Sequence, residues 1–449
     1  MRSSLTAYTG PFGRAEAERL LWRAGFGARR GEAQALAALG LTGAVRSLTR
    51  PGKEKLVGRA PRDENGKPLA PIDAYGHDHL WWLDRMVRTT RPLVERMTLV
   101  WHDWFATSND IVGSQRLMLQ QNALFRREGL GSFEQLLLGV TRDPAMLVWL
   151  SGLDNAKDAP NENYGRELME LFTLGADRPG GYTETDVRQQ ARALTGWTAD
   201  YKDNVGYQHF HFDKTRHDTG FKTVFGRRGR WSWEDACRLC LNHPNHASFF
   251  VRKLWNYFVP TSPPEGTQQA LERLYVRTGH QIRPVVEAIL VQPDLYAGPS
   301  MVKPPVVYTA GLLRALGRSI DDSGWSYLDA VSGQQLFYPP NVSGWDDDRW
   351  LDTASFRGRW WVADAALAAT TLDEGAPPKL PTDPAALLQR ALKSIDGLAV
   401  SAEARSVLAT FVRNALADAD EDWKQESYPA MIFNAVRQLA AVSPEQQVC

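Results

Sequence analysis

The stretch from Asn161 to Gly175 has the residue types best suited to chemistry. At 3.6 residues per turn, Glu167 and Glu170 lie at the edge of an apolar helix face. A half-buried carboxylate there must be paired, hydrogen-bonded, metal-bound or protonated, because uncompensated burial of its charge is costly. The i, i+4 spacing of Arg166 to Glu162 and to Glu170 also allows ion pairs that would only steady a helix. The pattern leaves open both a polar functional site and a structural ion-pair set.

Two histidines could supply a metal ligand or carry a proton. His102 lies in a predicted helix over 92–106, on the side opposite its broad apolar face. Histidine titrates near neutrality and is the commonest metal ligand, although a hydrogen-bonded or exposed histidine is the simpler interpretation. His217 is followed by Asp218 and, four residues later, by Lys222, in a glycine-containing loop. The alternative for Asp218 is that it caps a turn.

A second group of possible ligands is Cys237, Cys240, His243 and His246. Steps of three residues along a helix drift around its axis, so these side chains do not converge as zinc requires. Leu241 stands where a covalent haem site needs histidine. We therefore do not expect zinc or haem here.

Bulk properties exclude several classes of protein. The formal net charge of +0 over 449 residues argues against nucleic-acid binding. No window is apolar for long enough to span a bilayer, and residues 1–13 lack the apolar core of a secretory signal. With only three cysteines, a disulfide framework is not expected, and we predict a reducing, cytoplasmic location. No nucleophile elbow, phosphate loop or dinucleotide fingerprint is present.

The elements that must position these residues are mainly helices, so we predict an all-α fold, a large multi-helix assembly. A short alternation of apolar and polar residues predicts a β-hairpin or strand insertion near 207–229. We expect a main helical domain over 1–372, a linker rich in proline, glycine and charge over 373–384, and a C-terminal helical appendage over 385–449. The principal predicted helices are 15–27, 32–49, 75–89, 92–106, 115–127, 132–140, 161–174, 183–197, 232–241, 247–259, 267–278, 282–291, 304–318, 327–336 and 354–371.

Several unusual motifs occur in order along the chain. They are Leu20–Gly27, Trp101–Phe105, Asn161–Gly175, Gly181–Val187, Ala193–Trp197, His217–Lys222, Arg252–Trp255 and Pro339–Trp345. From about Ala15 to Trp361 the chain thus resembles the bacterial domain-of-unknown-function family 1800. The resemblance implies a helical protein without an agreed activity, often encoded beside a sulfatase-like partner. Many members are exported, so export by way of a partner is the alternative to a cytoplasmic location. Trp104 stands where the family usually has a second histidine.

We expect the polar motif residues to converge in one pocket. The leading hypothesis is an enzyme, with or without a metal ion, that hydrolyses its substrate or uses acid–base chemistry. Its predicted catalytic residues are Glu167, Glu170, Arg166, Asp218 and Lys222. Its predicted metal ligands, for Zn, Mn or Fe, are His102, Glu167, Glu170 and His217. The alternative is a non-catalytic binding or assembly protein that works with the sulfatase-like partner through the tryptophan-rich loop 339–350. A third hypothesis is saccharide binding by the tryptophans of that loop, and a fourth is that the motifs form buried ion-pair networks.

Overall fold

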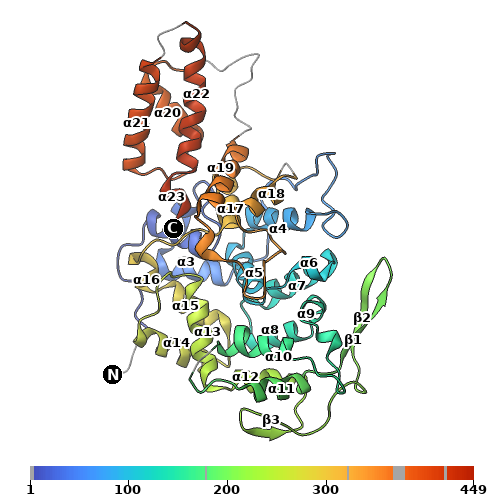
Figure 1. The fold of residues 1–449 in the computed structure, drawn as a ribbon. Coiled ribbons are helices and arrows are strands. Elements are labelled where there is room, and N and C mark those ends of the chain that lie inside the picture. Colours follow the sequence, from blue (N-terminus) through green and yellow to red (C-terminus); the bar gives the residue numbers. More distant parts are fainter. Residues whose placement is uncertain (1–4, 177–178, 321–322, 368–379, 419–421) are drawn as a thin grey trace.

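Helices account for most of the computed structural model, and its strands form only two separate antiparallel pairs (Figure 1). The structure describes residues 5–176, 179–320, 323–367, 380–418 and 422–449. The predicted all-α fold with a small β insertion is confirmed. None of the helices in these ranges is both long and apolar enough to cross a bilayer.

The first third of the chain forms nine helices before the Asn161–Gly175 motif. They are α1 (Arg14–Arg23), α2 (Glu32–Ala37), α3 (Gly40–Thr49), α4 (His77–Arg88), α5 (Pro92–Trp104), α6 (Asn109–Val112), α7 (Gln115–Glu128), α8 (Phe133–Thr141) and α9 (Pro144–Trp149). The motif itself contains α10 (Asn163–Glu167) and the π-helix η2 (Leu168–Leu174), after the short 3₁₀-helix η1 (Gly152–Asp154). The single helix predicted over 161–174 therefore changes its hydrogen-bond pattern at Leu168.

The helices after the motif follow the predicted order. They are α11 (Glu184–Ala193), α12 (Trp233–Leu241), α13 (Pro244–Asn256), α14 (Glu265–Arg277), α15 (Ile282–Leu290), α16 (Pro293–Ala297), α17 (Pro305–Leu316), α18 (Trp325–Val331), η3 (Asp347–Arg349) and α19 (Thr353–Leu367). The last helices are α20 (Pro384–Ser394), α21 (Ala402–Ala417), α22 (Asp422–Ala441) and α23 (Pro444–Gln447).

Local sequence explains several helix boundaries. Pro92 occupies the first turn of α5, where its missing N–H costs no hydrogen bond. Thr183 and Asp186 form a capping box at the start of α11. That helix ends at Ala193, and Gly196 follows with φ +117°, a conformation that a helix cannot contain. The predicted extension of this helix to Trp197 is therefore wrong, and the β insertion begins there.

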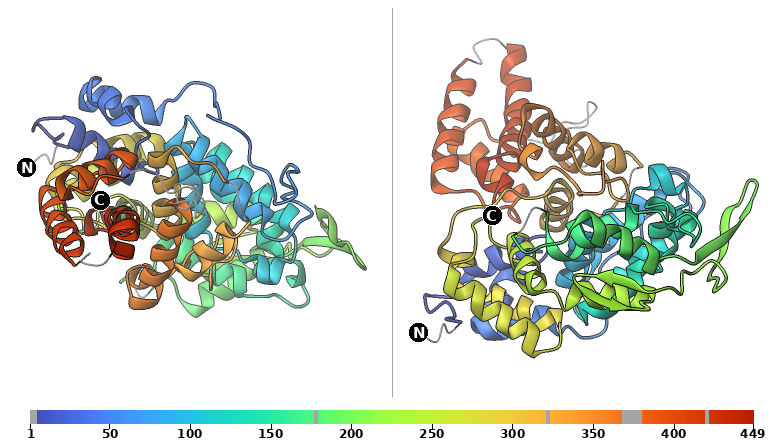
Figure 2. Two further views of the ribbon diagram at one scale, coloured as in Figure 1. Left: turned by 90° about the horizontal axis from the view of Figure 1, so that it is seen from above. Right: turned by 60° about the horizontal axis from the view of Figure 1, so that its bottom comes forward.

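The β insertion contains two hairpins. β1 (Trp197–Lys202) pairs with β2 (Gly206–Phe212), and β3 (Lys222–Val224) pairs with β4 (Arg227–Gly229). The β1–β2 hairpin projects from the body of the molecule (Figures 1 and 2). The β3–β4 hairpin packs against α11, so the loop between the hairpins is anchored to the helical body.

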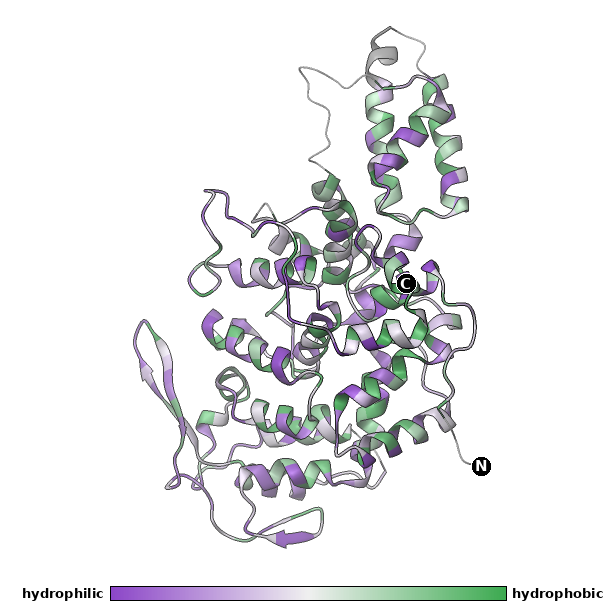
Figure 3. Ribbon diagram, turned by 180° about the vertical axis from the view of Figure 1, so that it is seen from behind, coloured by the Kyte–Doolittle hydropathy of each residue, from purple (hydrophilic) through white to green (hydrophobic). Residues whose placement is uncertain are grey.

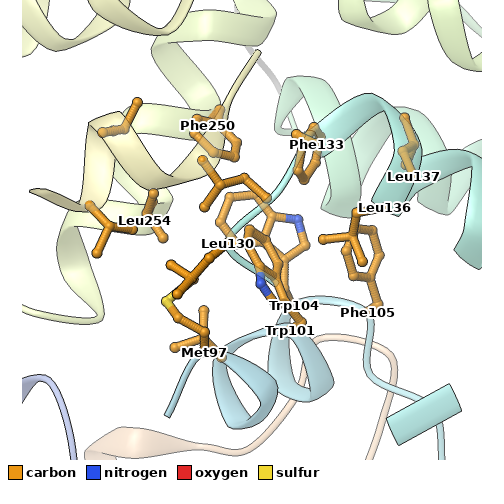
Figure 4. Close-up of a cluster of buried hydrophobic side chains, with 14 of the residues drawn as sticks. Met97, Trp101, Trp104, Phe105, Leu130, Phe133, Leu136, Leu137, Phe250 and Leu254 are labelled. Atoms are coloured by element: carbon orange, nitrogen blue, oxygen red, sulfur yellow. The ribbon is translucent and has the colours of Figure 1, made fainter. Parts of the chain in front are cut away.

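Helix α5 lies at the centre of the core. Its Trp101 and Trp104 pack against Phe133 of α8, and Trp104 also packs against Phe250 of α13 (Figure 4). Both tryptophans are fully buried. The other helices carry both hydrophobic and hydrophilic residues, as their colouring in Figure 3 shows. Their buried apolar residues belong either to this core or to a second cluster.

Helices α20, α21 and α22 form a bundle that stands at one end of the molecule (Figures 1 and 2). Its apolar residues are continuous with a second buried cluster that includes residues of α17 and α19. Part of the predicted linker, 373–379, lies outside the described residues. The proposed division into a main domain and an appendage stays a prediction.

The segment 444–449 returns from this bundle into the main body. Its backbone pairs with residues 301–303, with Met301 and Cys449 exchanging both N–H···O bonds. Arg23 of α1 donates to the carbonyl of Cys449 at 2.6 Å, and Lys303 donates to the carbonyl of Gln446 at 2.9 Å. Both side chains are buried. The final segment therefore supplies acceptors for buried cations of the main body.

Candidate functional site

The Asn161–Gly175 motif does contain an ion pair. Arg166 donates to both carboxylate oxygens of Glu184 at 2.7 Å, and to Glu162 at 3.3 Å. The pKa of Arg166 is raised, first of all by its hydrogen bonds to Glu184. Arg166, which was predicted as a catalytic residue, is therefore explained by the alternative of a structural ion-pair set.

Glu167 differs from its neighbours because its carboxylate has no hydrogen bond or ion pair within the described ranges. It is half-buried, and burial raises its pKa, as does the nearby charge of Glu170. Glu170 itself accepts a hydrogen bond from the hydroxyl of Tyr182 at 2.9 Å. The structure thus brings the two predicted carboxylates together and leaves one of them without a partner.

The π-helix Leu168–Leu174 ends with carbonyl groups that have no acceptor role inside the helix. Three side chains from other helices bond to the carbonyls of residues 171–173. Lys253 donates to the carbonyl of Leu171 at 3.0 Å. Trp104 donates to that of Phe172 at 3.1 Å, and His246 to that of Thr173 at 2.9 Å. Trp104, one of these three, therefore helps to cap the end of this helix.

The cluster of His217, Asp218 and Lys222 holds its own loop in shape. The Nδ1 of His217 donates to the carbonyl of Thr195 at 2.9 Å. Asp218 accepts from Arg192 at 2.6 Å and from the backbone N–H two residues later at 2.8 Å, which is the turn-capping role considered above. Lys222 is buried and donates to three backbone carbonyls, so it is not accessible to a substrate.

His102 lies inside the core. The prediction that it points away from the apolar face is wrong, because α5 is packed on nearly all sides. Its ring contacts Trp82, Phe337 and Trp345 and is 1% exposed. Burial lowers its pKa to about 3, so the ring is neutral, and its Nε2 accepts a hydrogen bond from the backbone N–H of Phe337 at 3.2 Å. His102 thus supports the chain segment that leads to Pro339–Trp345.

A second buried histidine, His79, supports the same chain segment by a hydrogen bond to the residue before Phe337. The Nδ1 of His79 in α4 accepts from the backbone N–H of Leu336 at 3.1 Å. Because Nδ1 accepts, the proton lies on Nε2, which donates to Asp329 of α18 at 2.9 Å. His79 was not predicted as a site residue, since the sequence of α4 carries no signal of a partner 257 residues later in the chain.

Asp103 completes the support of this loop. One carboxylate oxygen accepts from the backbone N–H of Trp345 at 3.0 Å, and the other accepts from the hydroxyl of Tyr257 at 2.6 Å. Gly344 has φ +96°, and a Cβ there would lie 2.2 Å from the Asp103 carboxylate. Only glycine allows this approach. We call His79, His102 and Asp103 the loop clamp.

Beside the clamped loop lies a cavity of about 360 Å³, which we call the aromatic pocket. Its wall includes the rings of Tyr338, Trp345 and Trp350 and the polar side chains of Gln335, Asp346 and Arg349. The indole Nε1 of Trp350 is buried and has no acceptor among the described residues. The sequence had marked this loop as a possible interface and, in a further hypothesis, as a saccharide-binding surface. The pocket combines flat apolar surfaces with an unused hydrogen-bond donor and groups of both charges.

The four residues predicted as metal ligands do not form one site. Within the described ranges, no three histidine, cysteine, aspartate or glutamate side chains are grouped as a metal ion requires. His102 is enclosed by aromatic rings. Cys237 and Cys240 are buried beside Thr141 and Gln190, and burial raises the pKa of both thiols.

Comparisons with known proteins give one match. The model of a family described as "Protein of unknown function (DUF1800)" matches residues 19–448. The match is longer than the stretch of motifs, because it continues beyond Trp361 through the helices α20–α23. No curated protein and no solved structure matches the chain.

Proposed function

Because the chain belongs to this family of unknown function, its activity must be inferred from its geometry, and we propose that it is a binding protein whose ligand occupies the aromatic pocket. The observation that carries this proposal is the loop clamp. Two motifs about 240 residues apart, Trp101–Phe105 and Pro339–Trp345, bond directly to each other at this loop. Their polar residues fix the backbone beside the pocket, which is how a binding site is made rigid before its ligand arrives.

The chemistry of the wall favours a hydroxyl-rich ligand such as a saccharide. Aromatic rings offer flat apolar faces, and polar groups around them orient a ligand by hydrogen bonds. Arg349 and Asp352 form an ion pair at 3.4 Å at the rim, so both donors and acceptors are present. The volume lies near the lower end of the ~300–1,000 Å³ of typical ligand pockets, which suits one or two sugar rings.

The experiment is a carbohydrate array followed by calorimetry on the ligand it identifies. We expect binding by the wild type and its loss in Trp345→Ala. Because Trp345 also packs on His102, Asp346→Asn provides a second variant, exposed at the rim and with no role in packing. Trp360→Ala, an exposed tryptophan of the nearby α19, is the matched control. No binding to any saccharide, or equal binding by wild type and both pocket variants, would contradict the proposal.

A second candidate function is acid–base catalysis at Glu167, favoured by its unpartnered carboxylate and its raised pKa. Glu170 is placed to assist it, while Arg166 neutralises the acidic surroundings. Elemental analysis of the protein and of Glu167→Gln tests the metal-assisted form of this hypothesis. About one metal per chain that is lost in the variant supports it, and a metal-free wild type contradicts it.

The partner implied by the family resemblance is a separate prediction. We expect a sulfatase-like protein to copurify with the chain if the protein works by assembly. Retention of the partner by Trp345→Ala would place the contact outside the aromatic pocket.

A further inference from the structure

A second cavity, of about 380 Å³, lies where four helices of the main body meet, away from the residues of the aromatic pocket. The end of α3, the start of α5, the end of α7 and the start of α15 form its wall. We call it the arginine pocket because five arginines line it and no acidic residue does. They are Arg50, Arg91, Arg126, Arg127 and Arg283.

Three of the five guanidiniums are already ion-paired on the side away from the cavity. The pairs are Arg50 with Glu287 at 2.9 Å, Arg126 with Glu95 at 2.6 Å, and Arg127 with Glu128 at 2.9 Å. These carboxylates do not line the pocket. Each pair therefore compensates charge and also fixes the direction of the arginine.

The pairing of Arg126 is the most rigid. Its Nε and Nη2 donate to both oxygens of Glu95, a fully buried carboxylate that also accepts from Trp82. Arg50 donates in the same two-nitrogen manner to Glu287. In both side chains the remaining nitrogen, Nη1, has no acceptor among the described residues. The guanidiniums of Arg50 and Arg126 are thus held in place, and each keeps one nitrogen that can donate to a ligand.

Arg91 and Arg283 have no ion pair within the described ranges, so the pocket carries a surplus of positive charge. The Nε of Arg91 is buried and without an acceptor. Buried donors are nearly always bonded, so an unbonded one beside a cavity indicates a missing acceptor. Arg91 also precedes the first turn of α5, whose amino end carries partial positive charge.

We propose that the arginine pocket binds a phosphate-bearing small molecule of about the size of a diphosphate. The planar guanidinium matches the oxygens of phosphate in a two-bond geometry, and several such groups around one cavity suit a multiply charged anion. One carboxylate would leave part of the charge surplus uncompensated. The proposal rests on different residues from the proposed saccharide site, so either can fail alone.

The test is calorimetry with inorganic pyrophosphate at constant ionic strength, with inorganic phosphate and glucose 6-phosphate as further probes. We expect pyrophosphate to bind the full-length protein and to raise its melting temperature. Arg283→Gln changes an exposed side chain without an ion pair, so it should leave folding intact and weaken binding by about tenfold or more. Arg91→Gln should do the same, and Arg277→Gln, an exposed arginine of α14 outside the pocket, is the matched control.

The remaining probes separate the sources of the phosphate group. Tighter binding of glucose 6-phosphate than of inorganic phosphate would identify a phosphate ester as the ligand, and the reverse would identify the free anion. Absence of pyrophosphate binding, or equal binding by wild type and Arg283→Gln, overturns the proposal. Citrate that binds more tightly than pyrophosphate overturns it as well, because the site would then be selective for carboxylates.

Discussion

Replacement of His102 by glutamine tests the loop clamp through the pH dependence of stability. Burial lowers the pKa of His102 from 6.5 to about 3 in the folded protein. Because the folded pKa lies below the unfolded one, the stabilisation from the neutral ring is complete above the unfolded pKa. It is lost as the pH falls from there toward the folded pKa. Protonation would also remove the acceptor of the Phe337 N–H.

The magnitude follows from the pKa difference. One unit corresponds to about 1.4 kcal/mol, so acidification from about pH 8 to pH 5 should lower the free energy of unfolding by about 2 kcal/mol through His102. His246, whose pKa is also lowered to about 3, adds a loss of similar size. In His102→Gln the amide oxygen can still accept from Phe337, but it does not titrate. The loss on acidification should therefore be about 2 kcal/mol smaller in this variant than in the wild type.

The assay is urea unfolding of both proteins at several pH values between these limits. Leu99→Ala, a buried change in the same helix, is the control, because it should lower stability by about 2–5 kcal/mol at every pH. If the wild type and His102→Gln lose the same stability on acidification, His102 is not a buried neutral acceptor, and the argument for the loop clamp fails.

Three further predictions concern the loop and the carboxylates. Gly344→Ala should destabilise the loop by about 1–3 kcal/mol and abolish ligand binding in the aromatic pocket, because a Cβ there would meet Asp103. A melting temperature equal to that of the wild type would contradict this geometry. Asp103→Ala should cost about 2–5 kcal/mol in urea unfolding, since two partly buried donors lose their acceptor, whereas Asp103→Asn keeps one acceptor and should cost less. Glu167→Gln should be more stable than the wild type at neutral pH, because the folded pKa of Glu167 is raised and the ionised form is the unfavourable one. The gain should shrink as the pH falls through the raised folded pKa toward the ordinary glutamate pKa, and it should be absent below that; lower stability of the variant would reveal a partner of the carboxylate.

The fold was largely predictable because its signals are local. Helix starts such as Pro92 and the Thr183–Asp186 capping box depend on residues within one turn. The change from α- to π-helix at Leu168 was not predictable, because the carbonyl groups it leaves free accept hydrogen bonds from three side chains of two distant helices, α5 and α13.

The candidate site was predictable only in part. The motifs directed attention to His102 and to the loop 339–350, but the bond between the His102 ring and Phe337 spans 235 residues. Periodicity placed His102 on a polar side, since it cannot show that a helix is packed on all sides. The arginine pocket could not be predicted from the sequence, because its side chains come from segments as far apart as Arg50 and Arg283.

The return of segment 444–449 to the main body couples the folding of α1 to a segment that is synthesised much later. Arg23 and its acceptor at Cys449 are separated by 426 residues, and Lys303 also depends on this segment. On the ribosome, Lys303 lacks these acceptors, and Arg23 has fewer of them, until the segment 444–449 has been synthesised. A chain that stops before residue 444 would leave buried positive charge without hydrogen bonds, a defect costly enough to mark such products for proteolysis. Synthesis of the segment 444–449 thus acts as a checkpoint for the folding of the main body.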